Sequence, residues 1–381
     1  MAAPLAGSRS DCATCAGKRS LFIRHRALVN MPIMRNTYLF LLPMMLLGLC
    51  LQPAQAEPKG FVAAEYGHPQ QFVPVEGTRR LNLVCIGRGE PAVIFLYGLG
   101  SGTFDWRKVQ PAIGMVTRAC TYDRAGNGFS DPAGRASDAT NAIADLHALL
   151  HASGLSKNRI ILVGHSLGGL YATLYAETYP REIAGVLLVE PAFEGQTQAI
   201  ADAVGPKAAR LLAASQAQTD RSQNQCIALA KLGRLSQPDE AGSDCLDNPP
   251  DADPEVHQEK NRELKTVAYQ RALTSENHDA NIAAPDRKTT DDVESERTGA
   301  SLGSIPLVVL TRGDSPVMPA LTADEQRREE AAWKAGHDRL AALSSRGTNI
   351  VVPHSGHFVQ LDRPRVVVEQ IKQILKQVRR Q

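Results

Sequence analysis

The sequence lacks the features that mark several large classes of protein. It has 42 Lys and Arg against 40 Asp and Glu in 381 residues, so no strong excess of charge points to a nucleic acid or an anionic membrane as partner. No internal repeat or low-complexity tract is evident. What it does have is 43% hydrophobic residues, enough to bury one large core. We therefore expect one domain that carries an insertion.

Long apolar runs are also scarce. The first, Tyr38 to Leu51, is too short to cross a bilayer as a mature helix, and it follows Arg35. Behind it, Ala54-Gln55-Ala56 has the small-x-small pattern of a signal-peptide cleavage site. We expect an exported protein, periplasmic or secreted, with a signal peptide within residues 31–56, a mature chain from Glu57 and no membrane span after cleavage.

On this reading residues 1–56 are a signal peptide preceded by a mis-assigned N-terminal extension, and Met31 or Met34 is the better start. A genuine extension is the alternative. A lipid anchor on Cys50 is a further alternative, although Leu49 is a poor match to the small residue that a lipoprotein signal needs before its cysteine. Without residues 1–56 the chain has 36 basic and 39 acidic residues, which again indicates no nucleic-acid partner.

Cysteine is scarce in the mature chain, where four residues remain: Cys85, Cys120, Cys226 and Cys245. None of them forms a Cys-x-x-Cys pair with a second ligand cluster, so we expect no metal site and no cofactor. An even number in an exported protein favours two disulfides. Because the first two lie on predicted strands and the last two in one polar insertion, we expect Cys85 to pair with Cys120 and Cys226 with Cys245. The crossed pairings and buried free thiols are the alternatives.

The main pattern along the chain is an alternation of apolar, β-rich runs with helix-like segments. Continuous Val, Ile and Leu runs suit strands that are covered on both faces, so the alternation predicts an α/β fold with a mostly parallel sheet. Helices are expected at 139–153, from a Thr322 to Glu325 capping box to about Leu343, and at Pro364–Val378. The predicted strands are 81–86, 92–97, 119–123, 160–164, 186–190, 307–311 and 349–353.

Between Phe193 and Ser304 this pattern breaks into short amphipathic pieces with no long apolar strand. We expect residues 194–303 to form a helical cap or lid, inserted after the sixth strand of the sheet, into a main domain made of residues 57–193 and 304–381. Its acidic part near Asp286–Glu296 is expected to be flexible.

The strongest sign of chemistry is Gly164-His165-Ser166-Leu167-Gly168-Gly169. A predicted strand ends just before it and a helix-like run follows, which is the order that a nucleophile elbow requires. In such an elbow the serine adopts a strained backbone conformation, and the flanking glycines let strand and helix approach closely. Ser166 is therefore the candidate nucleophile, with a chance Gly-x-Ser-x-Gly as the alternative.

A serine hydroxyl is a poor nucleophile unless a base takes its proton. His357 is the best candidate, because it lies between the last predicted strand and the final helix, and Gly356 before it gives the backbone freedom to aim the ring. His354 is an alternative. His165 sits on the tight turn itself and is expected to be structural.

Together with the turn Asp123-Arg124-Ala125-Gly126-Asn127-Gly128, these motifs resemble the alpha/beta-hydrolase superfamily, in its serine esterase and lipase branch. The resemblance covers about residues 78–193 and 304–380. It implies an alpha/beta-hydrolase fold with a mostly parallel central sheet, helices on both faces and a helical cap. It also implies that Asp123, Gly126 and Gly128 are scaffold.

The resemblance further implies an oxyanion hole made by two backbone N–H groups, those of Leu167 and, in the loop Tyr97 to Gly102, of Leu99. The chain departs from the family here, since many relatives have His-Gly where it has Tyr97-Gly98.

The acid that orients the histidine is left open between two residues. Asp314 follows the predicted strand 307–311, but the family register would place the carboxylate at Ser315. Glu190 ends the preceding predicted strand, from which some branches of the family draw their acid. If Glu190 is the acid, we expect its side chain to reach His357 from a strand that is separated from the nucleophile's strand by one other strand.

These residues predict hydrolysis of a carboxylic ester or related small acyl compound through an acyl-enzyme. Haloalkane dehalogenation and epoxide hydrolysis are excluded because they need an Asp at position 166. An acyltransferase with the same triad, or a non-catalytic ligand-binding protein on the same fold, are the alternatives.

Overall fold

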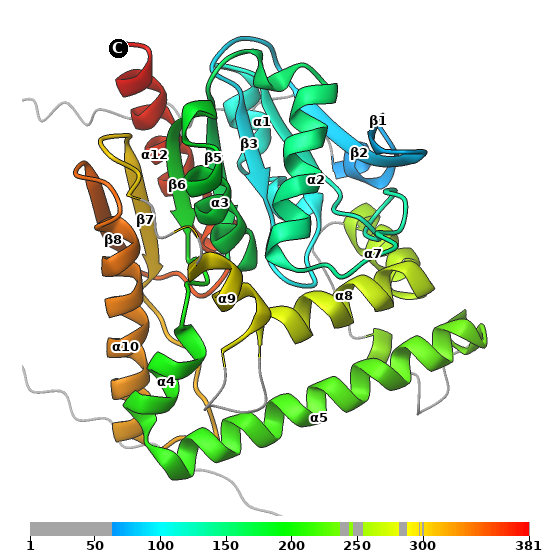
Figure 1. The fold of residues 1–381 in the computed structure, drawn as a ribbon, viewed down its shortest axis with the longest axis vertical. Helices are drawn as coiled ribbons and strands as arrows, with labels where there is room; N and C mark the ends of the chain where they lie inside the picture. The colour runs from blue at the N-terminus through cyan, green and yellow to red at the C-terminus, as the bar shows by residue number, and fades with distance from the viewer. Residues whose placement is uncertain are drawn as a thin grey trace, which may run out of the picture. The chain divides into compact units, whose positions relative to one another are not determined.

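The computed structural model describes residues 63–236, 244–246, 254–281, 288–296, 298 and 301–380. The expected signal peptide, its alternatives and Cys50 lie outside these residues. The remaining chain folds around one eight-stranded sheet (Figure 1).

The sheet has the strand order β1-β2-β4-β3-β5-β6-β7-β8. β1 and β2 pair antiparallel, as do β2 and β4, and all other neighbours are parallel. The α/β fold with a mostly parallel sheet is thus confirmed. The strands are β1 (Gln71–Glu76), β2 (Arg79–Ile86), β3 (Val93–Leu96), β4 (Ala119–Tyr122), β5 (Ile160–His165), β6 (Ile183–Val189), β7 (Leu307–Arg312) and β8 (Gly347–Val352).

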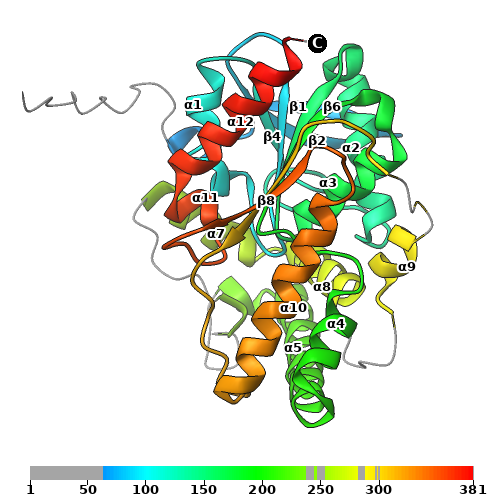
Figure 2. The ribbon, with the colours of Figure 1, turned by 90° about the vertical axis from the view of Figure 1, so that its left-hand side faces the viewer.

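Helices cover both faces of the sheet (Figures 1 and 2). Those on one face are α2 (Ala139–Ala152), α3 (Leu167–Thr178) and α10 (Ala323–Ala341), and those on the other are α1 (Gln110–Gly114) and α12 (Pro364–Val378), with α11 (Val359–Asp362) leading into α12. The expected capping box at Thr322 is present and opens α10. The buried side chains on each face are mostly aliphatic, as two-sided burial of the strands requires.

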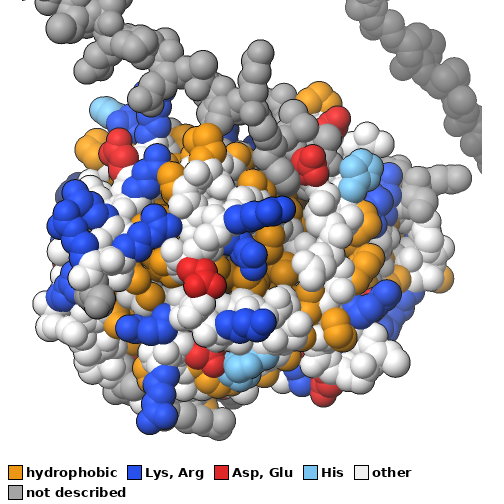
Figure 3. Space-filling view, turned by 90° about the horizontal axis from the view of Figure 1, so that it is seen from above, with side chains coloured by type: hydrophobic (Ala, Val, Ile, Leu, Met, Phe, Trp, Pro, Cys, Tyr) orange, Lys and Arg blue, Asp and Glu red, His pale blue; other side chains and the backbone are white. Residues whose placement is uncertain are grey.

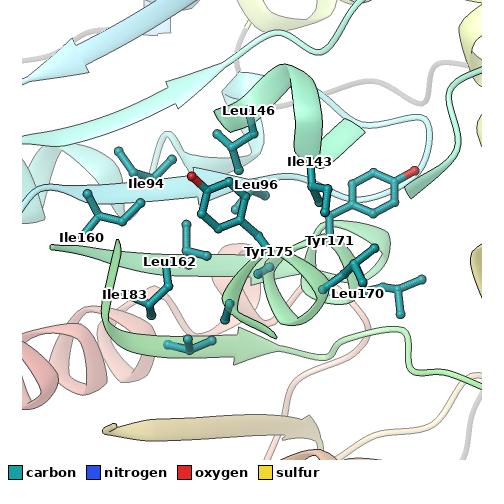
Figure 4. Close-up of a cluster of buried hydrophobic side chains, with 14 of the residues drawn as sticks. Ile94, Leu96, Ile143, Leu146, Ile160, Leu162, Leu170, Tyr171, Tyr175 and Ile183 are labelled. Atoms are coloured by element: carbon teal, nitrogen blue, oxygen red, sulfur yellow. The ribbon is translucent and has the colours of Figure 1, made fainter. Parts of the chain in front are cut away.

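The core on one face of the sheet lies between the strands and the pair α2 and α3 (Figure 4). Ile94, Leu96 and Leu162 rise from β3 and β5, and Leu146 of α2 and Tyr175 of α3 pack onto them. All five are essentially without solvent exposure. This packing fixes α3, and with it the turn that precedes α3, against the central strands.

Among the residues that the structure describes, five α-helices lie between β6 and β7, at the carboxyl ends of the strands (Figure 1). They are α4 (Gln196–Val204), α5 (Pro206–Lys231), α7 (Pro254–Leu264), α8 (Val267–Ala280) and α9 (Thr290–Glu296). The described part of this segment contains no strand, as the sequence predicts. The division at residues 194 and 303 into main domain and cap stays a prediction.

In the stretch near Asp286–Glu296, whose flexibility stays a prediction, residues 286 and 287 lie outside the described residues and the second half is helical. Residues 290–296 form α9, whose Asp291 accepts a hydrogen bond from the backbone N–H of Ala139 at 2.8 Å. Asp292 accepts one from Gly195 N–H at 2.7 Å. These acidic side chains are buried as acceptors for helix N-termini, which a reading of charge density alone does not reveal.

The end of the molecule away from these helices is seen in Figure 3. Lys and Arg side chains are spread over this face and are not gathered in one patch. No helix in the described ranges is both long and apolar enough to span a membrane.

Both expected disulfides are present. Cys85 of β2 and Cys120 of β4 are register partners in the sheet and are bonded, and Cys226 of α5 is bonded to Cys245 in the short 3₁₀ helix η6 (Asp244–Leu246). The first bond ties two neighbouring antiparallel strands, and the second closes a short loop in the helical segment between β6 and β7.

We expect protein made in an oxidising compartment to contain no free thiol in its mature part. Non-reducing peptide mapping should recover one peptide pair joined through Cys85 and Cys120 and another joined through Cys226 and Cys245. The same digest after reduction is the control. Free thiols at these four positions would contradict the pairing.

Candidate active site

Ser166 lies at the tip of a sharp turn between β5 and α3. Its backbone has φ 52° and ψ −124°, a region in which a residue with a side chain is strained. The turn is tight because the flanking glycines are in contact: a Cβ on Gly164 would lie 2.3 Å from the Gly168 carbonyl oxygen. A Cβ on Gly168 would lie 2.5 Å from the Leu96 carbonyl oxygen. Only glycine at these two positions lets the strand and the helix meet here.

His357 lies in the connection between β8 and α11, beside this turn. The His165 ring, next to Ser166, is bonded through Nε2 to the His357 carbonyl oxygen at 2.9 Å, and the two rings have their centroids 4.9 Å apart. Within the described residues the Ser166 hydroxyl has no hydrogen-bond partner. The other candidate base, His354, is exposed.

The contact between the two histidines gives His165 a structural part. Burial lowers the pKa of His165 to about 3, so the ring is neutral and its Nε2–H donates to the His357 carbonyl. His165 therefore holds the backbone of His357 next to the serine turn, in accord with the structural role that the sequence suggests.

Of the two candidate acids, the structure brings only Glu190 to His357. Glu190 follows β6 with φ 47°, is fully buried, and places Oε1 3.8 Å from His357 Nδ1. Asp314 is exposed, and its carboxylate has no hydrogen bond or ion pair to any described residue. Its backbone N–H donates to the Ser355 carbonyl at 2.9 Å, which fixes the loop and leaves the side chain outside.

One expectation about Glu190 is wrong. β6 is the immediate neighbour of the nucleophile's strand β5, with Val163 facing Leu187, and is not the strand next but one. Strand order in a parallel sheet depends on crossovers between distant segments, so it does not follow from order along the chain.

The Glu190 carboxylate is surrounded by hydrogen-bond donors. The Arg312 backbone N–H donates to Oε2 at 2.7 Å, the Arg312 guanidinium is paired with Oε1, and Trp333 Nε1–H donates to Oε1 at 2.8 Å. His337 Nδ1 is 4.0 Å from Oε2. Burial alone would raise the pKa of Glu190, but His357 and Arg312 together hold it at about 2. The group is therefore an anion at neutral pH.

These supporting residues were not identified from the sequence. Arg312 ends the apolar strand β7, and Trp333 and His337 lie four residues apart on α10. The residue types at these positions could have indicated the site. An Arg at a strand end, and a Trp and a His on one face of a helix, are hydrogen-bond donors that fit around a buried acceptor better than they fit in an apolar core.

The two expected oxyanion donors come from the turn at Ser166 and from the loop after β3. Leu167 is the first residue of α3, so its N–H has no acceptor within the helix. Leu99 lies in the loop after β3, and its N–H has no partner among the described residues. The preceding Gly98 touches the nucleophile: a Cβ there would lie 2.9 Å from Ser166 Cβ.

The carbonyl oxygens of this loop are held by cationic side chains. The Arg124 guanidinium donates to the carbonyls of Tyr97 at 2.7 Å and Gly98 at 3.0 Å. Arg124 is also joined to Glu276 of α8 by two bonds, of 2.7 and 2.8 Å, with both side chains buried. Arg124 therefore connects the loop to α8.

A second connection comes from α7 and α8. Lys260 Nζ donates to the Gly100 carbonyl at 2.7 Å, and so does the Tyr269 hydroxyl at 2.9 Å. With its carbonyls engaged in this way, the loop keeps its orientation beside Ser166. The segment between β6 and β7 thus supports the loop directly, which the sequence did not indicate.

The turn after β4 is the scaffold that the resemblance implies. The Asp123 carboxylate accepts from Asn82 Nδ2 at 2.9 Å and from the Phe129 backbone N–H at 3.1 Å. Burial raises the pKa of Asp123 to about 7. Gly128, with φ 51°, packs onto this carboxylate so closely that a Cβ would lie 2.3 Å from it. The turn thereby positions Arg124.

Comparison with known proteins agrees with this architecture. A family model described as "Alpha/beta hydrolase family" matches residues 93–370. Epoxide hydrolase 4 of Mus musculus is 33% identical over 113 residues, which are 29% of this chain and 31% of that protein. The chain spans about a third of the length of the curated relatives that it matches.

Two solved structures show the same fold. A putative ancestral haloalkane dehalogenase has a TM-score of 0.59 and 16% identity, over 82% of this chain and 100% of that one. A thermophilic esterase from Thermogutta terrifontis has a TM-score of 0.52 and 18% identity, over 81% of this chain and 98% of that one. At these identities the likeness is one of fold.

Proposed function

The chain belongs to the alpha/beta hydrolase family, and from this premise we propose that it is a serine hydrolase acting on a carboxylic ester or a related acyl compound. The observation that carries the proposal is Ser166 on its strained turn, with His357 held beside that turn and an anionic Glu190 3.8 Å behind the His357 ring.

In the proposed mechanism, Ser166 Oγ attacks the carbonyl carbon of the substrate. Because Nδ1 of His357 faces Glu190, Nε2 on the other side of the ring takes the proton from the serine and then gives it to the leaving alcohol. The N–H groups of Leu167 and Leu99 bind the oxyanion. Water then attacks the acyl-enzyme, with His357 as base, and releases the acid and free Ser166.

A serine at the turn separates this chemistry from that named for several similar proteins. Dehalogenation and epoxide opening on this fold need an aspartate nucleophile at position 166, and a serine there favours acyl transfer to water. The likeness to the mouse epoxide hydrolase is to a third of that protein, and we attribute it to the shared scaffold.

We also propose that the protein works outside the cytoplasm. The two disulfides support this, since such bonds form and persist in oxidising compartments.

Labelling with a fluorophosphonate tests the proposed function directly. The reagent should attach covalently to the native protein at Ser166 and not to Ser166→Ala, and a panel of esters of increasing acyl length should be hydrolysed with a preferred length. Absence of labelling on folded protein, together with no turnover in the panel, would favour a ligand-binding protein on the same fold.

We expect Lys260 to be a positioning residue for the oxyanion loop. Lys260→Met removes the donor to the Gly100 carbonyl, so the loop loses one of its two side-chain supports at that residue. A small displacement of an oxyanion donor should lower kcat by about tenfold to a hundredfold while KM changes little.

Steady-state kinetics on one ester checks this, and Lys265→Met is the matched control, because Lys265 lies just after the same helix and is exposed. A fall in kcat for both variants, or a rise in KM alone for Lys260→Met, would contradict the assignment.

A further inference from the structure

Two histidines and a glutamate meet at the end of α3 farthest from Ser166. His147 and His151 lie one turn apart on α2, and Glu182 ends the short helix η4 (Pro180–Glu182), which follows α3. Because α3 has 12 residues, this cluster is about 18 Å from the serine turn along the helix. It has no part in the proposed hydrolysis.

The ligand atoms of these residues converge. Glu182 Oε1 lies 3.5 Å from His147 Nδ1 and 3.1 Å from His151 Nε2, and all three atoms lie within 4.8 Å of one another. Around a tetrahedral zinc ion with bonds of about 2.0–2.1 Å, neighbouring ligand atoms are about 3.4 Å apart. The two measured separations lie on either side of that value.

Neighbouring tyrosines hold two of the three side chains in place. The Tyr175 hydroxyl donates to Glu182 Oε2 at 2.5 Å, which leaves Oε1 facing the histidines. The Tyr179 ring stacks on His147 with centroids 4.0 Å apart and planes 10° apart. Tyr175 itself is packed into the core between α2 and the sheet (Figure 4). Such supports orient the ligands of a metal site before the ion binds.

We propose that His147, His151 and Glu182 bind a divalent transition-metal ion of the zinc class. Two imidazole nitrogens and one carboxylate oxygen suit this class, and three protein ligands leave a fourth position for water. The side chains are exposed by 31%, 53% and 20%, so an ion can reach them from solvent. Binding would join α2 to the connection between α3 and β6.

The cysteine pattern alone predicts no metal site in this chain. The signal that it omits is His147-Ala148-Leu149-Leu150-His151, a pair of histidines at the spacing that puts both on one face of a helix. The third ligand comes from a segment 31 residues beyond His151 and is brought close only by the packing of α2 against α3.

The test uses full mature protein without a polyhistidine tag, stripped with a chelator, and zinc chloride as the probe. We expect one tightly bound Zn²⁺ per chain by calorimetry and elemental analysis, and a higher Tm in its presence. His151→Ala and Glu182→Gln should each weaken this binding at least tenfold. His68→Ala, at an exposed histidine outside the cluster, should bind as the native protein does.

Ester hydrolysis gives a second readout, because zinc and the His151→Ala substitution should leave it unchanged. Native protein that binds no zinc above the level of the double variant His151→Ala/Glu182→Gln would overturn the proposal. So would binding that is equally strong in all the variants, since the ion would then be held elsewhere.

Discussion

Ser166→Ala is expected to abolish nearly all esterase turnover, by about 10⁶-fold, while the protein stays folded. The attacking oxygen is lost and no other described hydroxyl occupies the tip of this turn. The fold should survive because Ser166 Oγ makes no hydrogen bond among the described residues, and the small side chain of alanine fits the same space. Initial rates on the best ester of the panel, with Tm as the measure of folding, check the result.

His357→Ala should be almost as severe, and the double variant Ser166→Ala/His357→Ala hardly worse than either alone. The two residues act as one unit, so removing the second after the first removes little more. Losses that multiply would indicate that another base serves Ser166. Turnover by Ser166→Ala comparable to that of the native protein would refute the nucleophile itself.

The elbow was predictable because its determinants are local. A buried strand, two glycines around a serine and a following helix are adjacent in the sequence, and the close approach at Gly164 and Gly168 requires those glycines. The covered strands were predictable for a similar reason, since burial on both faces leaves a continuous apolar run. β1 escaped prediction because it is an exposed edge strand with a proline, and of its side chains Val73 alone is fully buried.

What surrounds the nucleophile depends on contacts between distant segments. Arg124 meets Glu276 across 152 positions, and Arg312 meets Glu190 across 122. No periodicity links such partners, and each of the four could equally be a solvated charge when read alone. For the same reason the sequence left the acid open between Glu190 and Asp314, although it named both.

The choice between these acids gives the second large effect. Glu190→Gln should lower turnover by about 10⁴-fold, because the carboxylate holds the His357 tautomer and stabilises the imidazolium that forms in the transition state. Asp314→Asn is the matched control and should change turnover only slightly, since that side chain is exposed and has no hydrogen bond or ion pair with a described residue. Pre-steady-state acylation rates for the three proteins, measured well below the Tm of each, compare the effects.

Stability must be separated from catalysis here, because Glu190 also neutralises the buried Arg312. Trp333 and the Arg312 backbone N–H donate to different oxygens of the carboxylate, so a glutamine can keep only one of these two bonds. It also leaves the Arg312 guanidinium without a counter-charge, and a loss of Tm is therefore expected. The pH dependence of unfolding identifies the contribution of Glu190 to stability. With its pKa held at about 2, Glu190 contributes stability that is present above about pH 4.3 and is lost as the pH falls towards 2.

Glu190→Gln should lack that portion of the acid transition, and its loss of turnover should persist at pH 7 and low temperature, where the variant is folded. If turnover recovers fully under those conditions, Glu190 supports only the fold. If Asp314→Asn loses the 10⁴-fold instead, the loop at Gly313 must turn inward during catalysis and the triad is Ser166, His357 and Asp314. With Glu190 already 3.8 Å from Nδ1 and anionic at neutral pH, a shortening of that one contact when substrate binds completes the triad without such a movement.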